Sequence, residues 1–159
     1  MWISRAPWPR ASPSNSRRPR TIAIRPFADA DREAVVRLWT DCGLVVPWND
    51  PARDVARKLS QQREMFLVAE QDGRIVGSVM AGFDGHRGSV NYLAVDPNHR
   101  KRGIARRLMS EAERLLTEAG CPKLNVMVRR SNPAATGFYD ALGYAPDDVL
   151  VYGKRLIAD

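Results

Sequence analysis

The strongest constraint on the fold is a strand, a short basic loop and a long helix that follow one another between residues 89 and 119. Residues 89–95 read SVNYLAV, a pattern typical of a β-strand, and Asp96-Pro97 ends it. Along residues 104–119 one apolar stripe recurs at helical spacing, and charged residues oppose it. The stripe consists of Ile104, Leu108, Ala112, Leu115 and Ala119. A helix with one apolar face must cover another element, so this unit predicts helices layered on a sheet.

The rest of the chain alternates the same two patterns around this unit. Further strands are predicted at residues 21–27, 65–70, 74–83, 124–128 and 149–156, and further helices at 29–41, at 50–63 and after Asn132. Asp72-Gly73 is a favoured two-residue hairpin turn, and Asp50-Pro51 is a strong helix start. The predicted order is β-α-α-β-β-β-α-β-α-β-β. This order is typical of an α/β (α+β) domain with a mixed central β-sheet flanked by helices.

The positive charge of the chain is concentrated at its beginning. Residues 1–20 hold five arginines, four prolines and no acidic residue, so they carry most of the net charge of +7. We expect this segment to be a disordered basic extension, with residues 21–159 forming one folded domain. The alternative is a nucleic-acid-binding arm, which would bind in a salt-dependent way. We expect nucleic acid not to be the main partner.

The composition of the chain limits where the protein can act and whether it binds a metal. No apolar run approaches the about 18 residues that a membrane span requires, so we expect no membrane insertion. Cys42 and Cys121 lie far apart, which favours the reducing cytoplasm over a disulfide framework. His86 and His99 have no partners at ligand spacing, so no metal is predicted.

The basic loop before the long helix has the chemistry of an anion site. Arg100, Lys101 and Arg102 supply positive charge, and Gly103 permits a positive φ or a close backbone approach. The first N–H groups of the helix are unpaired and lie at its positive end. The loop therefore suits a pyrophosphate, although it has neither P-loop nor dinucleotide-fingerprint spacing. The plainer alternative is a solvated basic loop.

These residues resemble a known family. Arg100-x-x-Gly103-x-Ala105 is similar to the Q/R-x-x-G-x-G/A motif of the GNAT (GCN5-related N-acetyltransferase) superfamily, which binds the pyrophosphate of acetyl-CoA. Residues 93–97 (LAVDP) resemble the family's central strand, and Asn132 with residues 138–144 (FYDALGY) resembles the segment that closes the CoA site. The resemblance covers about residues 21–157. Finer features, such as residues 47–51 (PWNDP), resemble the YpeA-type bacterial acetyltransferases.

The resemblance implies a GNAT fold and an acetyl-CoA-dependent N-acetyltransferase that acts by direct attack of a primary amine on the thioester. The implied cofactor-binding residues are Leu93, Ala94, Val95, Arg100, Lys101, Arg102, Gly103, Ile104, Ala105, Asn132 and Tyr139. A backbone N–H near residues 93–95 would polarise the carbonyl, and Tyr139 would protonate the departing sulfur. The acceptor, a protein N-terminus, a lysine or a small amine, stays open, as does the choice between a monomer and a homodimer. The alternative is a non-catalytic acyl-CoA-binding or regulatory module.

The general base is the least constrained part of the site. Related N-terminal acetyltransferases of ribosomal proteins place a Glu where Met127 aligns, and Met127 cannot take a proton. Asp84 and His86 are candidate bases, although the same residues are also typical of a plain turn, and a water relay is a further alternative. Trp48 and Asn49, with Asp84, are the candidate residues for binding the acceptor.

Overall fold

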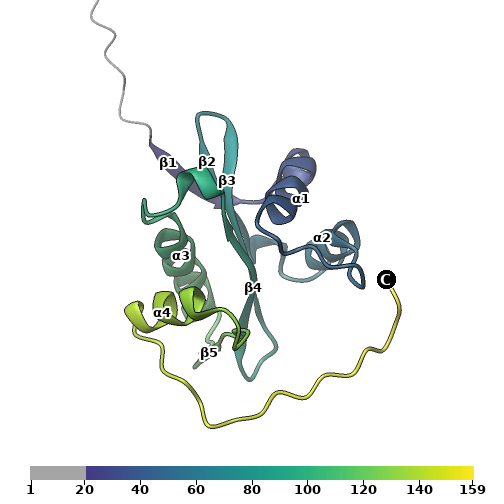
Figure 1. Ribbon diagram of the computed structural model, residues 1–159, viewed down its shortest axis with the longest axis vertical. Coiled ribbons are helices and arrows are strands. Elements are labelled where there is room, and N and C mark those ends of the chain that lie inside the picture. Colours follow the sequence, from purple (N-terminus) through teal and green to yellow (C-terminus); the bar gives the residue numbers. More distant parts are fainter. Residues whose placement is uncertain (1–20) are drawn as a thin grey trace, which may run out of the picture.

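A five-stranded sheet separates two layers of helices in the computed structural model, which describes residues 21–159 (Figure 1). The predicted basic extension lies outside the described residues. The strands are β1 (Ile22–Pro26), β2 (Phe66–Gln71), β3 (Arg74–Phe83), β4 (Gly88–Val95) and β5 (Leu124–Asn125), and they lie in this order across the sheet. The first four pair antiparallel, whereas β4 and β5 pair parallel, so the sheet is mixed as predicted.

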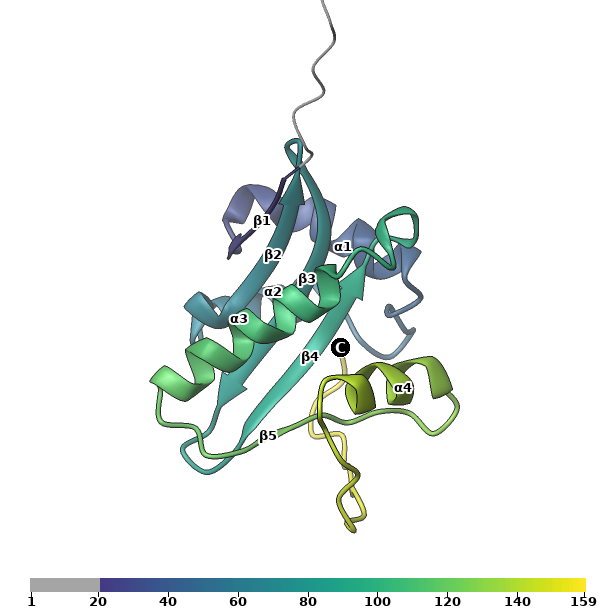
Figure 2. The same cartoon turned by 90° about the vertical axis from the view of Figure 1, so that its left-hand side faces the viewer.

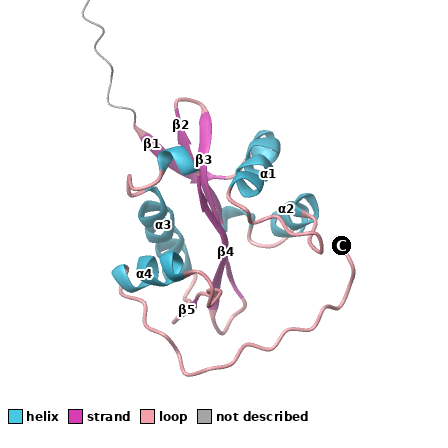
Figure 3. Cartoon of the chain, in the orientation of Figure 1, coloured by secondary structure: helices cyan, strands magenta, loops and turns pink. Residues whose placement is uncertain are grey.

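Two helices cover each face of the sheet. The helices are α1 (Arg32–Asp41), α2 (Pro51–Leu59), α3 (Ile104–Glu118) and α4 (Pro133–Ala141). The first two lie on one face and the last two on the other (Figure 3). Short 3-10 turns precede α1, β2 and the basic loop, at Asp29–Asp31, Arg63–Met65 and Pro97–His99.

Each face of the sheet has its own core, because the side chains of β2 alternate between the two. Leu67 and Ala69 contact the α3 side, whereas Phe66 and Val68 contact the α1 side. The α3 core includes Ile104, Leu108, Met109, Ala112 and Leu116. The α1 core is built around Trp39, which is fully buried, with Val35, Leu38 and Val55. β2 is therefore buried on both faces, and it reads as a continuous apolar run in the sequence.

The predicted local signals are confirmed. Asp72 and Gly73 form the β2–β3 turn with φ values of 51° and 76°, as a two-residue hairpin requires. The side chain of Asp50 accepts hydrogen bonds from Ala52 N at 2.8 Å and Arg53 N at 3.3 Å, which is the geometry of a helix N-cap.

The prediction for the last part of the chain was wrong in two respects. The strand expected at residues 124–128 is reduced to β5, and residues 149–156 form no strand. This segment is rich in strand-forming residues, but a strand needs a partner, and no described strand lies beside it. Residues 145–159 instead run from α4 around the molecule to α2, where Asp159 pairs with Arg57 (Figure 1).

The second helix is also shorter than expected, since it ends at Leu59. Residues 60–65 follow as a bend and a 3-10 turn, because Gln62 adopts a left-handed conformation with φ 51°. None of the helices in residues 21–159 has the length and apolar character to cross a bilayer.

Candidate active site

The sheet opens between its two parallel strands, and the opening is the centre of the candidate site. β4 and β5 pair only at Gly88 with Leu124 and Ser89 with Asn125. Beyond this point the chain turns away from β4 toward α4 (Figure 2). Within residues 21–159, no strand pairs with residues 90–95 on this side. Tyr92 O accepts from the Ser78 hydroxyl, and Val95 O accepts from Cys42 Sγ and Arg100 Nε. The other outward backbone groups of this stretch can pair with a ligand that carries amides.

A bulge in β4 lies in the open stretch. Met80 pairs with Asn91 and Ser78 with Ala94, so Tyr92 and Leu93 together face the single residue between Ser78 and Met80. Tyr92 has φ 52°, a left-handed conformation that is rare for a residue with a side chain. The bulge turns backbone groups of the free edge away from the regular ladder.

A buried contact chain holds the bulge in this conformation. The Ser78 hydroxyl donates to Tyr92 O at 3.0 Å and accepts from Trp39 Nε1 at 2.8 Å. The Tyr92 ring stacks on Trp39, with 3.9 Å between the ring centroids. Ser78 and Trp39 are fully buried, so the strained residue is fixed by the core of the α1 layer.

The predicted anion loop follows β4 directly. Lys101 and Gly103 both have positive φ, at 60° and 75°, and Arg100 Nε donates to Val95 O at 3.4 Å. The first helical hydrogen bond of α3 runs from Arg107 N to Gly103 O at 3.0 Å. The N–H groups of residues 104–106 therefore point out of the helix start.

The side chains of the loop are positively charged, as is the start of the helix dipole. Arg100, Lys101 and Arg102 are exposed, and they form no ion pair within residues 21–159. Backbone donors at a helix start and three unpaired cations fit a pyrophosphate. The loop thus has the features that the sequence predicted for binding CoA.

Helix α4 lies on the same face of the sheet as α3 and carries two of the predicted residues. Asn132 caps the helix, since its Oδ1 accepts from Ala135 N at 3.1 Å. Tyr139 packs edge-on against Phe138 and Tyr144, with ring centroids 5.1 Å and 5.4 Å apart. Burial raises the pKa of the Tyr139 phenol, so the hydroxyl keeps its proton at neutral pH.

The structure does not bring Asp84 and His86 together with these residues. Both lie in the β3–β4 turn, at the opposite end of β4 from the basic loop, and β4 is about 25 Å long. Asp84 Oδ1 accepts from the backbone N–H groups of His86 at 2.7 Å and Arg87 at 2.8 Å. These bonds, that of Arg87 first, lower the pKa of Asp84, which makes its carboxylate a weaker base. The geometry around Asp84 and His86 is therefore that of a simple turn between two strands, the alternative to a catalytic role that the sequence analysis gave.

Asn49 reaches β4 from the other face of the sheet. Its Nδ2 donates to Tyr92 Oη at 2.9 Å and to Asp54 Oδ2, and Tyr92 Oη donates to Asp54 Oδ2 at 2.6 Å. Burial, and next the hydrogen bond to Asp54, raise the pKa of Tyr92 to about 12. Trp48, which the sequence analysis also named as a candidate for binding the acceptor, is 57% exposed.

Sequence reasoning missed Asp54 and Tyr92. An acidic residue in the first turn of a helix is ordinarily explained by the helix dipole, and Asp54 occupies such a position in α2. The sequence places Tyr92 in a strand but does not reveal the bulge. A bulge depends on how β4 pairs with β3, and a local sequence pattern does not show this pairing.

A mixed sheet that opens at a bulge, beside a basic helix start, is an α/β architecture suited to an anionic ligand that carries amides. The acetyltransferase (GNAT) family model matches residues 32–144, which is most of the chain. The chain therefore belongs to the GNAT family of acetyltransferases and is an N-acetyltransferase by class.

Relatives from bacteria agree with this assignment. An acetyltransferase of Yersinia enterocolitica is 54% identical over 138 residues, which are 87% of this chain and 98% of that protein. An acetyltransferase of Pectobacterium atrosepticum is 53% identical over 138 residues, with the same two coverages. The predicted YpeA-type branch fits these relatives.

Solved structures agree with the fold. The aminoglycoside N-acetyltransferase AAC(6')-Iy in complex with CoA superposes with a TM-score of 0.72 at 19% identity, covering 89% of this chain and 99% of that chain. Ard1 from Thermoplasma volcanium superposes with a TM-score of 0.71 at 24% identity, covering 78% of this chain and 82% of that chain. At these identities the likeness establishes the fold alone.

Proposed function

We propose that the protein transfers the acetyl group of acetyl-CoA directly to a primary amine. The observation that carries the proposal is the free edge of β4, residues 90–95, which leads directly into the anion-binding start of α3. The CoA-bound relative AAC(6')-Iy shares this fold. We also propose a bacterial cytoplasm as its location, which the bacterial origin of the named relatives and the presence of only two cysteines support.

Binding of acetyl-CoA would use backbone groups more than side chains. The pyrophosphate would accept from the N–H groups of Ile104 and Ala105, with Arg100, Lys101 and Arg102 around it. The amides of the pantetheine arm would pair with the outward backbone groups of Leu93 and with the N–H of Val95, as an added strand does, whereas Ala94 O faces Gly77 of β3. Asn132 at the start of α4 would close the other side of the gap.

The reacting thioester would then lie at the β4 bulge. A backbone N–H near Leu93 would donate to the carbonyl oxygen as it gains negative charge. The C–N bond forms, the C–S bond breaks and the thiolate takes up a proton. Tyr139 is the proposed donor, because its hydroxyl keeps its proton at neutral pH and α4 lies on the cofactor side of the gap.

The amine must also lose a proton to become a nucleophile. Asp84 is turned into its own loop and lies toward the far end of β4, so neither it nor His86 has geometric support as the base. We propose that the proton leaves through water on the α1–α2 face of the sheet, where Asn49 and Tyr92 meet.

The test is a thermal-shift titration of the parent chain and of Gly103→Glu with acetyl-CoA, followed by an assay of CoA release with a panel of primary amines. Gly103 precedes α3 with φ 75°, and an added carboxylate would occupy the anion site. At a ligand concentration about 100-fold above Kd, binding adds about 2.7 kcal/mol of stability, which raises Tm by about 5–11 °C. We expect this rise in the parent and its loss in Gly103→Glu.

The matched control is Gly120→Glu. Gly120 has φ 83° and, like Gly103, no atom within 4 Å of an added Cβ, so the backbone strain and charge change are the same at the opposite end of α3. Gly120→Glu should keep the Tm rise with acetyl-CoA. No rise in the parent chain, or no CoA release with any amine, rejects the proposed function.

A further inference from the structure

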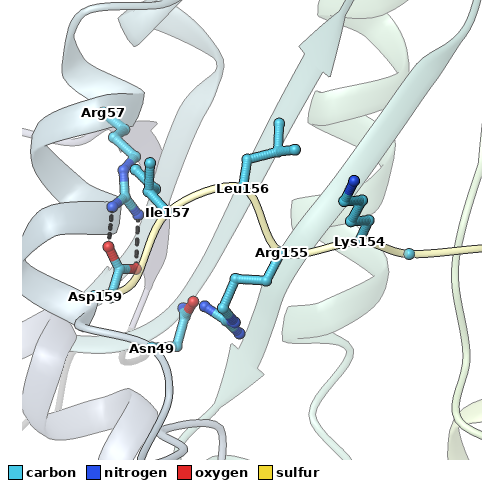
Figure 4. Close-up of a pocket in the computed structure, with 8 residues that line it drawn as sticks. Asn49, Arg57, Lys154, Arg155, Leu156, Ile157 and Asp159 are labelled. Carbon is cyan, nitrogen blue, oxygen red and sulfur yellow. Dashed lines mark hydrogen bonds and ion pairs between the residues drawn. The ribbon is translucent and has the colours of Figure 1, made fainter.

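A cavity of about 600 Å³ lies on the α2 side of the sheet, across from the CoA loop. It is lined by Asn49 and Arg57 and by residues 153–157 and Asp159 of the C-terminal segment, with Ile157 beside Arg57 (Figure 4). The hollow is open to solvent, and its volume is sufficient for a small molecule. One lining residue, Asn49, contacts the hydroxyl of Tyr92, whose backbone forms the bulge at the proposed reaction centre.

The wall nearest the bulge presents a hydrogen-bond acceptor of defined orientation. Asp54 is a carboxylate and can only accept, so the amide group of Asn49 that faces it must be the N–H₂. The same N–H₂ donates to Tyr92 Oη, and Tyr92 Oη donates to Asp54. Asn49 Oδ1 has no partner within residues 21–159 and remains available on a residue that lines the cavity. Asp54 and Tyr92 are therefore positioning residues for Asn49.

The rest of the lining carries an excess of positive charge. Arg57 is neutralised, because it pairs with Asp54 at 2.9 Å and with Asp159. Lys154 and Arg155 form no ion pair within residues 21–159. The Arg155 guanidinium turns toward Asn49 (Figure 4). An acceptor of hydrogen bonds and a pair of unneutralised cations thus face the same cavity.

We propose that the acceptor is a small primary amine that also carries an anionic group, a carboxylate or a phosphate. This inference rests on the proposed function. The amine donates to Asn49 Oδ1 beside the β4 bulge, and the anionic group pairs with Arg155, assisted by Lys154.

The experiment compares matched amines on the full chain with saturating acetyl-CoA. The first pair is lysine and cadaverine, which differ by one carboxylate, and the second is O-phosphoethanolamine and ethanolamine, which differ by one phosphate. We expect the anionic member of at least one pair to have a kcat/KM about tenfold or more above its neutral partner, as a charge-assisted bond provides. The pair that shows the preference identifies the anion.

The variants assign the preference to the cavity. Arg155→Gln should abolish it by raising the KM for the anionic amine while the KM for acetyl-CoA and the Tm stay unchanged, and Arg155→Lys should retain part of it. The matched control is Arg74→Gln in the β2–β3 hairpin, which removes the same charge from another exposed arginine without an ion pair in the described residues. It should leave the preference intact.

Three outcomes overturn the inference. Neutral amines that react as fast as their anionic partners reject the acidic acceptor and leave the acetyltransferase proposal standing. A preference that survives Arg155→Gln and Lys154→Gln rejects the cavity as its source. Acetyl-CoA binding without transfer to any of the four amines rejects the small acidic acceptor, and binding that is absent altogether rejects the proposed function as well.

Discussion

Three partly buried tyrosines pack against the two cores, and they differ in the hydrogen bonds that their hydroxyls make. They are Tyr92, Tyr139 and Tyr144. Tyr144 Oη donates to Glu113 Oε1 at 2.5 Å, and Tyr92 Oη donates to Asp54 at 2.6 Å. The hydroxyl of Tyr139 makes no hydrogen bond within residues 21–159, and burial raises its pKa. The protonated hydroxyl of Tyr139 is therefore free to donate to a substrate, whereas the hydroxyls of Tyr92 and Tyr144 already donate to carboxylates.

Tyr139→Phe tests that assignment. Removing the hydroxyl should lower kcat by about 100-fold or more, as expected for a general acid, while the Tm rise caused by acetyl-CoA stays the same. Tyr144→Phe is the matched control and should change stability more than kcat, since it loses only the bond to Glu113. An equal loss of acetyl-CoA binding and kcat in Tyr139→Phe would contradict the acid role.

At the scale of single residues, the sequence predicted the residues whose role depends only on their neighbours along the chain. Asp50, Asn132 and Gly103 were predicted from helix-end chemistry, and the structure places each at a helix start. Asp54 and Tyr92 were missed, because their contact joins residues that are 38 positions apart in the chain. Their roles depend on tertiary structure and leave no local signal.

Among the elements, α3 and the strands it covers form the part of the site proposed to bind acetyl-CoA. Gly77 in β3 allows the start of α3 to approach closely. A Cβ at this position would lie 3.0 Å from Leu108 Cδ1, 3.1 Å from Ile104 Cγ2 and 3.1 Å from Ala94 O. The last of these is a backbone atom of β4 and cannot move aside, so a side chain here would displace the helix start.

Gly77→Ala should therefore destabilise the protein by about 1–3 kcal/mol, measured by urea unfolding. It should also reduce the Tm rise with acetyl-CoA, since the N–H groups of α3 would no longer lie beside the end of β4. Gly82→Ala in the same strand is the control, because its Cβ would meet only the flexible side chains of Gln62 and Lys58, at 3.5 Å or more. A Gly77→Ala chain that is as stable as the parent would refute the close-packing argument.

The elements themselves were predictable where periodicity is local. The unit of β4, the basic loop and α3 was predicted with nearly the observed bounds, because Gly103 and Gly120 mark both ends of the helix. The β4 bulge and the shortness of β5 were not predictable, since both depend on how neighbouring strands pair. The strand expected at residues 149–156 failed for the same reason: strand-forming residues without a partner strand stay extended and unpaired.

On the scale of the whole molecule, a partly buried ion network connects the start of the α1 layer to the edge of the sheet. Arg25 on β1 pairs with Asp31 at 2.7 Å and with Glu70 on β2 at 2.7 Å. Asp31 is buried, and its hydrogen bond with Arg25 lowers the pKa of its carboxyl. A depressed pKa contributes stability above the unfolded value of 3.8, and this contribution is lost as the pH falls below that value.

Asp31→Asn should accordingly cost about 1–2 kcal/mol at pH 7, a modest loss because Arg25 is partly exposed to solvent. The difference from the parent should shrink as the pH falls from 3.8 through the lowered pKa of the folded state, below which the parent carboxyl is also neutral. Urea unfolding at a series of pH values measures both quantities. A difference that stays constant with pH would show that the charge of Asp31 does not contribute.

The gap between β4 and β5 has a consequence for the order of events in turnover. The loop proposed to bind CoA lies on the α3 side of the sheet, and the cavity beside Asn49 lies on the α2 side. On the proposed arrangement, the two substrates approach one carbon atom from opposite sides of the sheet and do not share a path. Both can be bound at once, and neither product blocks the exit of the other. Turnover would then proceed through a ternary complex with no obligatory order of release.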